Sequence, residues 1–400
     1  METTKMTARR NLIVTLPIVL ILAAGCSVVG DVGIPALRSA GLASVATAAL
    51  IPTATPARLD AGGLPTPAFT QPLDLPTQAA PPASTPTPVP TATELVFEVG
   101  KEITIEYLQG LEITGSEITI EQELEGNFYY RQVIASYISE GNKIYGLLTI
   151  PAGEPPEGGF KAIVFNHGYI PPSAYQTTER YVAYVDYLAR YGFVVFKIDL
   201  RGHGNSEGEP SGSYFSPGYT IDAIAALKSL QTLDFIDPQG IGMWGHSMAG
   251  NLVLRAMLVE PDIQAGVIWA GAVYSYDDLE KYGIDDNTYR PPETLATQEA
   301  SRSSRREIFD TYGQPDTANA YWQAVSLTEN IEYLNSPIQL HHAEDDTVVN
   351  IGYSYELAGV LQAHGKPYEF YNYESGGHNL ISPYFDQAML RTVEFFRNNL

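Results

Sequence analysis

The sequence predicts an α/β domain built on a doubly wound, mostly parallel sheet. From residue 161 onward, short segments that are apolar throughout alternate with longer segments of helical character. Strands that are apolar on both faces are typical of a parallel sheet covered by helices on either side. The expected strands are 161–167, 193–199, 241–244, 265–271, 337–342 and 367–373, and the expected helices between them are 180–192, 219–231, 251–260 and 353–365.

A β-rich extension is expected ahead of this sheet, over residues 94–150. The segments 102–110, 116–124 and 131–139 carry β-branched residues at every second position, and 143–151 continues the pattern into the main domain. Alternation with a period of two favours strands.

The alternation of strand and helix is interrupted at residues 274–330, where helices are expected over 301–313 and 319–325. An insertion at this point of such a fold falls near the end of the sheet where ligands bind. We expect it to form a cap over the binding site, and a surface excursion without function is the alternative.

The N-terminus has the pattern of a targeting segment. Lys5, Arg9 and Arg10 precede an apolar run, residues 12–25, which is too short and too interrupted by proline for a comfortable membrane span. The run ends at Cys26, the chain's one cysteine. The stretch LAAGC resembles the lipobox of bacterial lipoproteins, which implies removal of residues 1–25 and attachment of lipid to Cys26, and thereby an extracytoplasmic, membrane-anchored protein. An ordinary secretory signal is the alternative.

Residues 26–93 are rich in alanine, proline and threonine. Frequent prolines favour extended, hydrogen-bond-free backbone, and few large apolar side chains are present to offset the entropy of folding. We therefore expect a disordered tether between Cys26 and a domain at 94–400. Its most proline-rich part, residues 64–93, has none of the basic residues typical of proline-rich ligands of other domains.

The charge balance argues against nucleic acid as a partner. The chain carries 46 acidic and 23 basic residues, a formal net charge of -23. A surface this negative repels the phosphate backbone. No P-loop and no dinucleotide-binding fingerprint is present, so no cofactor is expected.

Ser247 is the candidate nucleophile. It lies between an expected strand and an expected helix, with Gly245 two places before it and Ala249 two places after it. A serine on a sharp strand-to-helix turn projects its hydroxyl group, and small neighbours make such a turn possible. The hydroxyl also needs a base and a carboxylate that orients the base.

His378 is the expected base, because it follows the last expected strand in a loop that Gly376 and Gly377 make adaptable. The carboxylate is expected after the strand 337–342, where Glu344, Asp345 and Asp346 stand together.

Residues 137–400 resemble the α/β-hydrolase superfamily, in particular its branch of esterases and prolyl oligopeptidase-like enzymes. The matching motifs, in family order, are NHGY, DLRGHGNSEG, GHSMAG, EDDTVV and GGH. The family's aspartate is followed three places later by valine, which selects Asp345 with Val348, and Asp346 is the reserve choice. The resemblance also implies an oxyanion hole made by the backbone N–H groups of Tyr169 and Met248.

A metal site is the rival chemistry for the segment around His341 and His342. Adjacent residues of a strand point to opposite faces, so these two histidines cannot easily share an ion. We therefore expect no metal.

The expected activity is hydrolysis of a small carboxylic ester through an acyl-enzyme on Ser247. A peptidase of the prolyl oligopeptidase-like type that takes short peptides is the first alternative. Only about 60 strand-rich residues precede the catalytic domain, too few for the β-propeller of prolyl oligopeptidases. A surface lipoprotein that uses the fold for binding alone is the second alternative.

Overall fold

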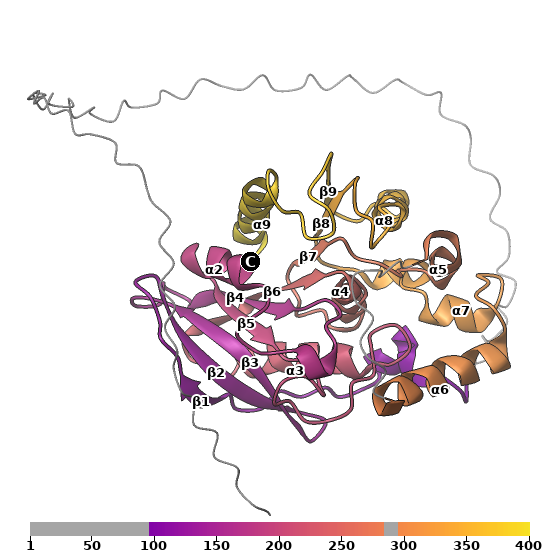
Figure 1. Cartoon of the computed structure of the whole chain (residues 1–400), viewed down its shortest axis with the longest axis horizontal. Helices are drawn as coiled ribbons and strands as arrows, with labels where there is room; N and C mark the ends of the chain where they lie inside the picture. Colours follow the sequence, from indigo (N-terminus) through magenta and orange to yellow (C-terminus); the bar gives the residue numbers. More distant parts are fainter. Residues whose placement is uncertain (1–95, 284–294) are drawn as a thin grey trace, which may run out of the picture. The chain divides into compact units, whose positions relative to one another are not determined.

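The structure, a computed structural model, describes residues 96–283 and 295–400 (Figure 1). The predicted signal segment 1–25, Cys26 and the tether up to residue 93 lie outside these ranges. No helix in the described ranges combines the length and apolar character needed to cross a bilayer.

One sheet of nine strands organises the described residues, in the order β1-β2-β3-β5-β4-β6-β7-β8-β9. The pairs β1–β2, β2–β3 and β3–β5 are antiparallel, and all pairs from β5 to β9 are parallel. The mostly parallel, doubly wound sheet predicted from the sequence is thus confirmed. The strands are β1 (Thr119–Glu123), β2 (Tyr130–Ser139), β3 (Asn142–Pro151), β4 (Phe160–Asn166), β5 (Val194–Ile198), β6 (Ile236–His246), β7 (Gly266–Trp269), β8 (Ile338–Ala343) and β9 (Tyr368–Tyr373).

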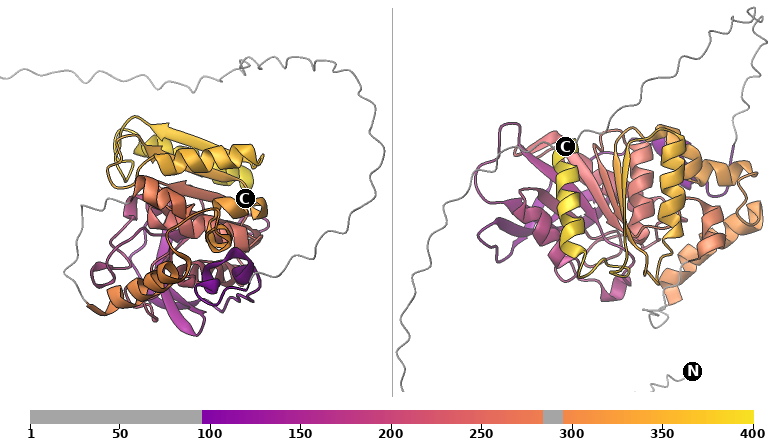
Figure 2. Two further views of the ribbon diagram at one scale, coloured as in Figure 1. Left: turned by 90° about the vertical axis from the view of Figure 1, so that its right-hand side faces the viewer. Right: turned by 90° about the horizontal axis from the view of Figure 1, so that it is seen from above.

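Helices cover both faces of the sheet (Figures 1 and 2). On one face lie α2 (Val182–Arg190) and α9 (Phe385–Asn399), whose apolar side chains share a buried cluster. On the other face lie α3 (Gly218–Leu230), α4 (Met248–Val259) and α8 (Gly352–Ala363). The helix α9 is not among the elements expected from the sequence. Covered on both sides, β5 is buried along its whole length, as expected for a parallel strand.

The strand expected at residues 102–110 is wrong. This segment forms a short 3-10 helix, η1 (Lys101–Ile103), followed by α1 (Ile105–Gln109). The hydroxyl oxygen of Thr104 accepts a hydrogen bond from the N–H of Tyr107 at 3.2 Å and caps α1. Ile105 and Leu108 then fall on one buried helical face. The spacing of the apolar side chains in residues 102–110 is compatible with both a strand and a helix. The Thr104 cap and the packing of the buried face favour the helix.

The insertion at 274–330 contains α5 (Tyr276–Tyr282), α6 (Leu295–Tyr312), α7 (Ala320–Val325) and the 3-10 helix η3 (Thr328–Tyr333). The two helices predicted there are confirmed as α6 and α7. Their described contacts reach the segment before α1: the ring of Phe97 packs against Tyr312 and Tyr321, and the Tyr321 hydroxyl donates to the carbonyl of Gly100. The insertion therefore holds the first described residues, and its function as a cap stays a prediction.

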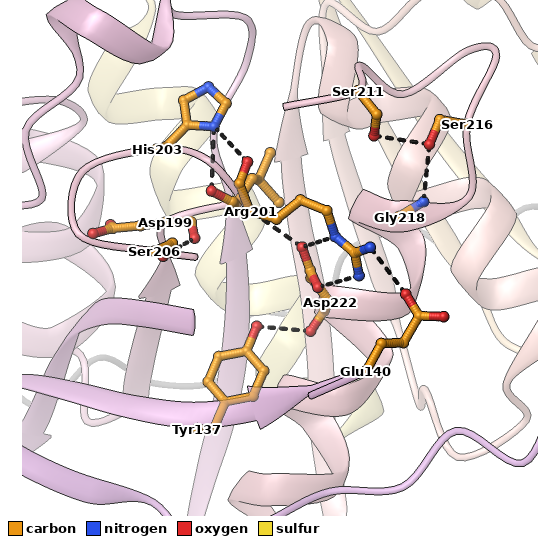
Figure 3. A network of polar contacts seen from close by, with 11 residues as sticks. Tyr137, Glu140, Asp199, Arg201, His203, Ser206, Ser211, Ser216, Gly218 and Asp222 are labelled. Atoms are coloured by element: carbon orange, nitrogen blue, oxygen red, sulfur yellow. Dashed lines mark hydrogen bonds and ion pairs between the residues drawn. The ribbon is translucent and has the colours of Figure 1, made fainter. Parts of the chain in front are cut away.

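The loop after β5, in the motif DLRGHGNSEG, is fixed by a buried ion pair (Figure 3). The guanidinium of Arg201 donates to both carboxylate oxygens of Asp222 on α3, at 2.9 and 2.7 Å. It also lies 2.9 Å from the carboxylate of Glu140, which is about half exposed, whereas the Asp222 side chain is fully buried. Tyr137 on β2 donates to the backbone carbonyl of Asp222 at 2.8 Å. The pair therefore connects the loop to α3 and β2.

Replacing Asp222 by Ala is expected to lower the free energy of unfolding by about 3–5 kcal/mol, because Arg201 loses its buried partner and retains only the half-exposed Glu140. The change Glu140→Gln, which touches the same arginine at the exposed end, is expected to have a much smaller effect. Urea unfolding measures both variants. Equal losses would show that the buried pair contributes no more than the surface contact.

Candidate functional site

Ser247 lies on the turn between β6 and α4, in a strained backbone conformation with φ 57° and ψ -121°. A positive φ is uncommon for a residue with a Cβ and is found at sites where the surroundings enforce it. Here the N–H of Ser247 donates to the carbonyl of Trp269 on β7, and its carbonyl accepts from the N–H of Gly250. The placement of Ser247 between strand and helix agrees with the prediction.

Two glycines permit this turn. A Cβ on Gly245 would lie 2.6 Å from the carbonyl oxygen of Ala249, and a Cβ on Gly250 would lie 2.6 Å from Cα of Gly271. Contacts this short cannot be accommodated without a shift of the backbone. Ala249, which departs from the usual glycine of the motif, is fully buried. The close approach of α4 to the loop after β7 falls at Gly250, one place after this alanine.

His378 follows β9, after Gly376 and Gly377, which have φ 131° and 59°. Its Nδ1 lies 2.8 Å from Oδ2 of Asp346. Ser247 and His378 line the same pocket. Within the described residues no hydrogen bond joins the Ser247 hydroxyl to His378, and such bonds are often loose before substrate binds.

The choice of Asp345 as the partner of His378 is wrong, since the carboxylate that contacts the imidazole belongs to Asp346. Asp345 is exposed and accepts a hydrogen bond from the N–H of Gly377 at 2.8 Å, so it holds the loop that carries His378. The motif spacing fits either residue, because Asp346 also has a valine three places later. That valine, Val349, is buried, whereas Val348 is only partly buried.

Asp346 has the surroundings of a permanently ionised group. Its Oδ1 accepts from the N–H groups of Val348 and Val349 at 2.8 and 3.0 Å. Nε2 of His342 lies 3.2 Å from its Oδ2. Burial acts to raise the pKa of Asp346, but the hydrogen bonds from His342 and His378 outweigh burial and hold this pKa well below its usual range. Because an ionised carboxylate only accepts, Nδ1 of His378 is the donor, which leaves Nε2 as the nitrogen that can act as a base in the neutral imidazole.

A second imidazole, that of His246, stands beside the nucleophile position. Nε2 of His246 donates to the backbone carbonyl of His378 at 2.8 Å, and the two rings lie 4.5 Å apart. Since Nε2 is the donor, Nδ1 accepts from the hydroxyl of Tyr181, also at 2.8 Å. Burial is the main cause that lowers the pKa of His246 to about 3. His246 is therefore neutral near pH 7 and serves as a hydrogen-bonding spacer.

Tyr181 extends this chain to the loop after β4. Its hydroxyl oxygen accepts from the N–H of Gly168 at 2.9 Å, and a Cβ on Gly168 would lie 3.1 Å from Cβ of Ser247. The loop that contains Tyr169 is thus adjacent to Ser247, and Met248 is the first residue of α4, whose N–H has no partner within the helix. The sequence gives no local signal for the His246–Tyr181 contact, because 65 residues separate them.

The pocket around Ser247 has a volume of about 480 Å³. It lies beyond the carboxyl ends of β4 and β6, where the chain order in the sheet reverses, the usual ligand position in such sheets. None of the described residues of the insertion 274–330 lines it. The lining residues are Gly168, Tyr169, Ile170, Arg180, Tyr181, Tyr184, His246, Ser247, His378, Asn379 and Ile381.

The histidines at 341 and 342 contact different neighbours. His341 bonds to Tyr373 and Gln339, whereas His342 bonds to Ser354 and to the carbonyl of Val349. In the described ranges no group of three or more histidine, cysteine, aspartate or glutamate side chains is arranged to hold a metal ion.

Comparison with known proteins gives consistent likenesses. A family model described as serine aminopeptidase, S33, matches residues 160–303. The uncharacterized peptidase YtmA of Bacillus subtilis is 26% identical over 246 residues, which make up 60% of this chain and 84% of that protein.

Solved structures show the same fold. Acetyl xylan esterase 1 from Thermoanaerobacterium sp. JW/SL YS485 matches with a TM-score of 0.54 and 15% identity, over 74% of this chain and 94% of that chain. A puromycin-hydrolyzing peptidase of Mycobacterium tuberculosis matches with a TM-score of 0.53 and 19% identity, over 69% of this chain and 40% of that one. With the sheet order and the strand-to-helix turn at Ser247, these likenesses show that the described part of the chain has the α/β-hydrolase fold.

Proposed function

We propose that the protein is a serine hydrolase that cleaves carboxylic esters through an acyl-enzyme on Ser247. The observation that carries the proposal is the joint placement of Ser247, on its strained turn, and of the His378–Asp346 pair at one pocket. A hydroxyl group becomes a nucleophile when a positioned base removes its proton, and this arrangement supplies the base.

The proposed reaction has two halves. Nε2 of His378 takes the proton of the Ser247 hydroxyl as Oγ attacks the ester carbonyl, and ionised Asp346 stabilises the imidazolium that forms. The negative charge on the carbonyl oxygen is met by the N–H groups of Met248 and Tyr169. The tetrahedral intermediate expels the alcohol, which receives the proton from His378. Water then repeats the sequence on the acyl-enzyme and releases the carboxylic acid and Ser247.

A peptidase is the second candidate, favoured by the family model and by the name of the Bacillus subtilis relative. A peptidase that acts at a free N-terminus must bind an ammonium group, for which carboxylates are the usual partners. The described residues that line the pocket include no aspartate or glutamate. This observation favours the ester.

A fluorophosphonate probe is expected to label the full-length protein on Ser247, because such probes react with activated serines. Mass spectrometry of peptides locates the label, and Ser247→Ala is expected to abolish it and to lower ester hydrolysis by roughly 10³-fold or more. Folded wild-type protein that remains unlabelled would contradict the catalytic reading and favour the third candidate, a lipoprotein that only binds.

Substitutions of the adjacent residues Asp345 and Asp346 are expected to differ sharply in their effect on kcat. Asp346→Asn places an amide where His378 needs an acceptor, and a loss of roughly 10⁴-fold in kcat with a small change in KM is expected. Asp345→Asn keeps an oxygen for the N–H of Gly377, so kcat is expected to fall only a few-fold. Steady-state kinetics on one neutral ester compares them. A larger loss for Asp345→Asn would reverse the assignment.

We also propose that lipid on Cys26 anchors the enzyme to a membrane. The proposal is supported by the basic start, the apolar run 12–25 and the small residues before Cys26. In an expressing bacterium, the membrane fraction is expected to contain protein whose N-terminal peptide begins at lipid-modified Cys26, and Cys26→Ser is expected to remain unprocessed. A wild-type N-terminus without lipid would instead establish an ordinary secretory signal.

A further inference from the structure

Arg180 is the one formally charged residue at pH 7 among the described residues that line the pocket at Ser247. It is exposed, and none of the contacts in the described part of the chain pairs its guanidinium with a carboxylate. We propose that Arg180 binds an anionic group of the substrate, so that the preferred substrates are carboxylic esters that carry a further negative charge. This inference rests on the proposed function and names its substrate class.

Acidic residues outnumber basic residues in this chain, 46 to 23, so carboxylates are plentiful as partners for its cations. Some cations of the domain are ion-paired: Arg190 pairs with Asp186, and Lys228 pairs with two acids. Arg391, which lacks a carboxylate, lies over the ring of Tyr371 with 4.1 Å between guanidinium and ring centre. At the pocket, the guanidinium of Arg180 remains available to a ligand. Its planar, forked arrangement of N–H groups matches the geometry of carboxylates and phosphates.

The backbone that carries Arg180 is held in place. The ammonium group of Lys197, which is fully buried, donates to the carbonyl of Arg180 at 3.1 Å. The next residue, Tyr181, has φ 60°, and its hydroxyl is fixed between Gly168 and His246. Two costly features, a buried ammonium and a strained tyrosine, thus fix the start of this side chain beside the loop that approaches Ser247.

The same charge disfavours the competing class of substrate. The α-ammonium group of a peptide would meet Arg180 as a like charge, and no carboxylate among the lining residues would compensate for it. An anion would instead form a charge-assisted hydrogen bond, the stronger kind, in a pocket that already holds the proposed nucleophile. The charge of the pocket thus differs in sign from the net charge of the chain.

The test compares charged and neutral esters of the same shape. On the acyl side, the monoanion of 4-nitrophenyl hydrogen adipate is compared with 4-nitrophenyl hexanoate. On the alcohol side, 4-(butyryloxy)benzoate is compared with its methyl ester. The ratio of kcat/KM for the charged and the neutral ester is measured for the full-length protein, Arg180→Gln and Arg180→Lys. The control is Arg306→Gln, which removes an equal charge from an exposed position outside the pocket lining.

Arg180→Gln is expected to lower this ratio roughly tenfold to hundredfold for one of the two pairs, the range for a lost hydrogen bond to a charged group. Arg180→Lys is expected to keep part of it, and Arg306→Gln to leave it unchanged. Any loss of folded enzyme cancels in the ratio. The pair that responds locates the anion on the acyl or the alcohol side.

Three results would overturn the proposal. The first is that Arg180→Gln leaves the charged-to-neutral ratio of kcat/KM unchanged for both ester pairs while Ser247 is still labelled by the fluorophosphonate. This result would contradict the anion site and leave the proposed function intact. The second is an equal fall for Arg306→Gln, which would indicate general electrostatic steering. The third is either a wild-type protein that hydrolyses none of the esters or hydrolysis that persists in Ser247→Ala. Either result would contradict the proposed function together with the anion site.

Discussion

The site depends on one backbone constraint, the positive-φ conformation of Ser247 between β6 and α4. A residue with a Cβ stays in this conformation only where the surroundings compensate for about 1–3 kcal/mol of strain. The hydrogen bond to Trp269 on β7 and the close contact of Gly250 with Gly271 supply that compensation. Both reach across to the neighbouring strand and its loop. The packing of β6 against β7 therefore sets the position of the hydroxyl group as much as the turn does.

The order of strands and helices could be predicted, because burial on both faces imposes a composition that local sequence displays. The segment 102–110 was beyond this reasoning: its apolar residues fit two periods, and the cap by Thr104 decides between them. The roles of Asp345 and Asp346 have a similar cause. Two adjacent acids share one motif, and only the folded loop shows that one accepts from an imidazole and the other from a backbone N–H.

Serine and histidine of the candidate site could be placed from sequence because each stands in a local context that its chemistry requires, a turn or a glycine-rich loop. Residues such as His246, Tyr181 and Arg180 have no such context. Their importance comes from contacts between segments far apart in the chain, and from a pocket that exists only after the segments following β4, β6 and β9 come together at one edge of the sheet. Single-sequence reasoning has no access to these juxtapositions.

The hydrogen bonds that run from Gly168 through Tyr181 and His246 to the carbonyl of His378 join opposite walls of the pocket without using any substrate atom. The separation of the walls is consequently set by contacts within the protein and does not depend on a substrate. In such a rigid pocket, the residues at the pocket entrance determine which substrates are preferred. New selectivity could then arise by changing the rim residues while the frame stays untouched.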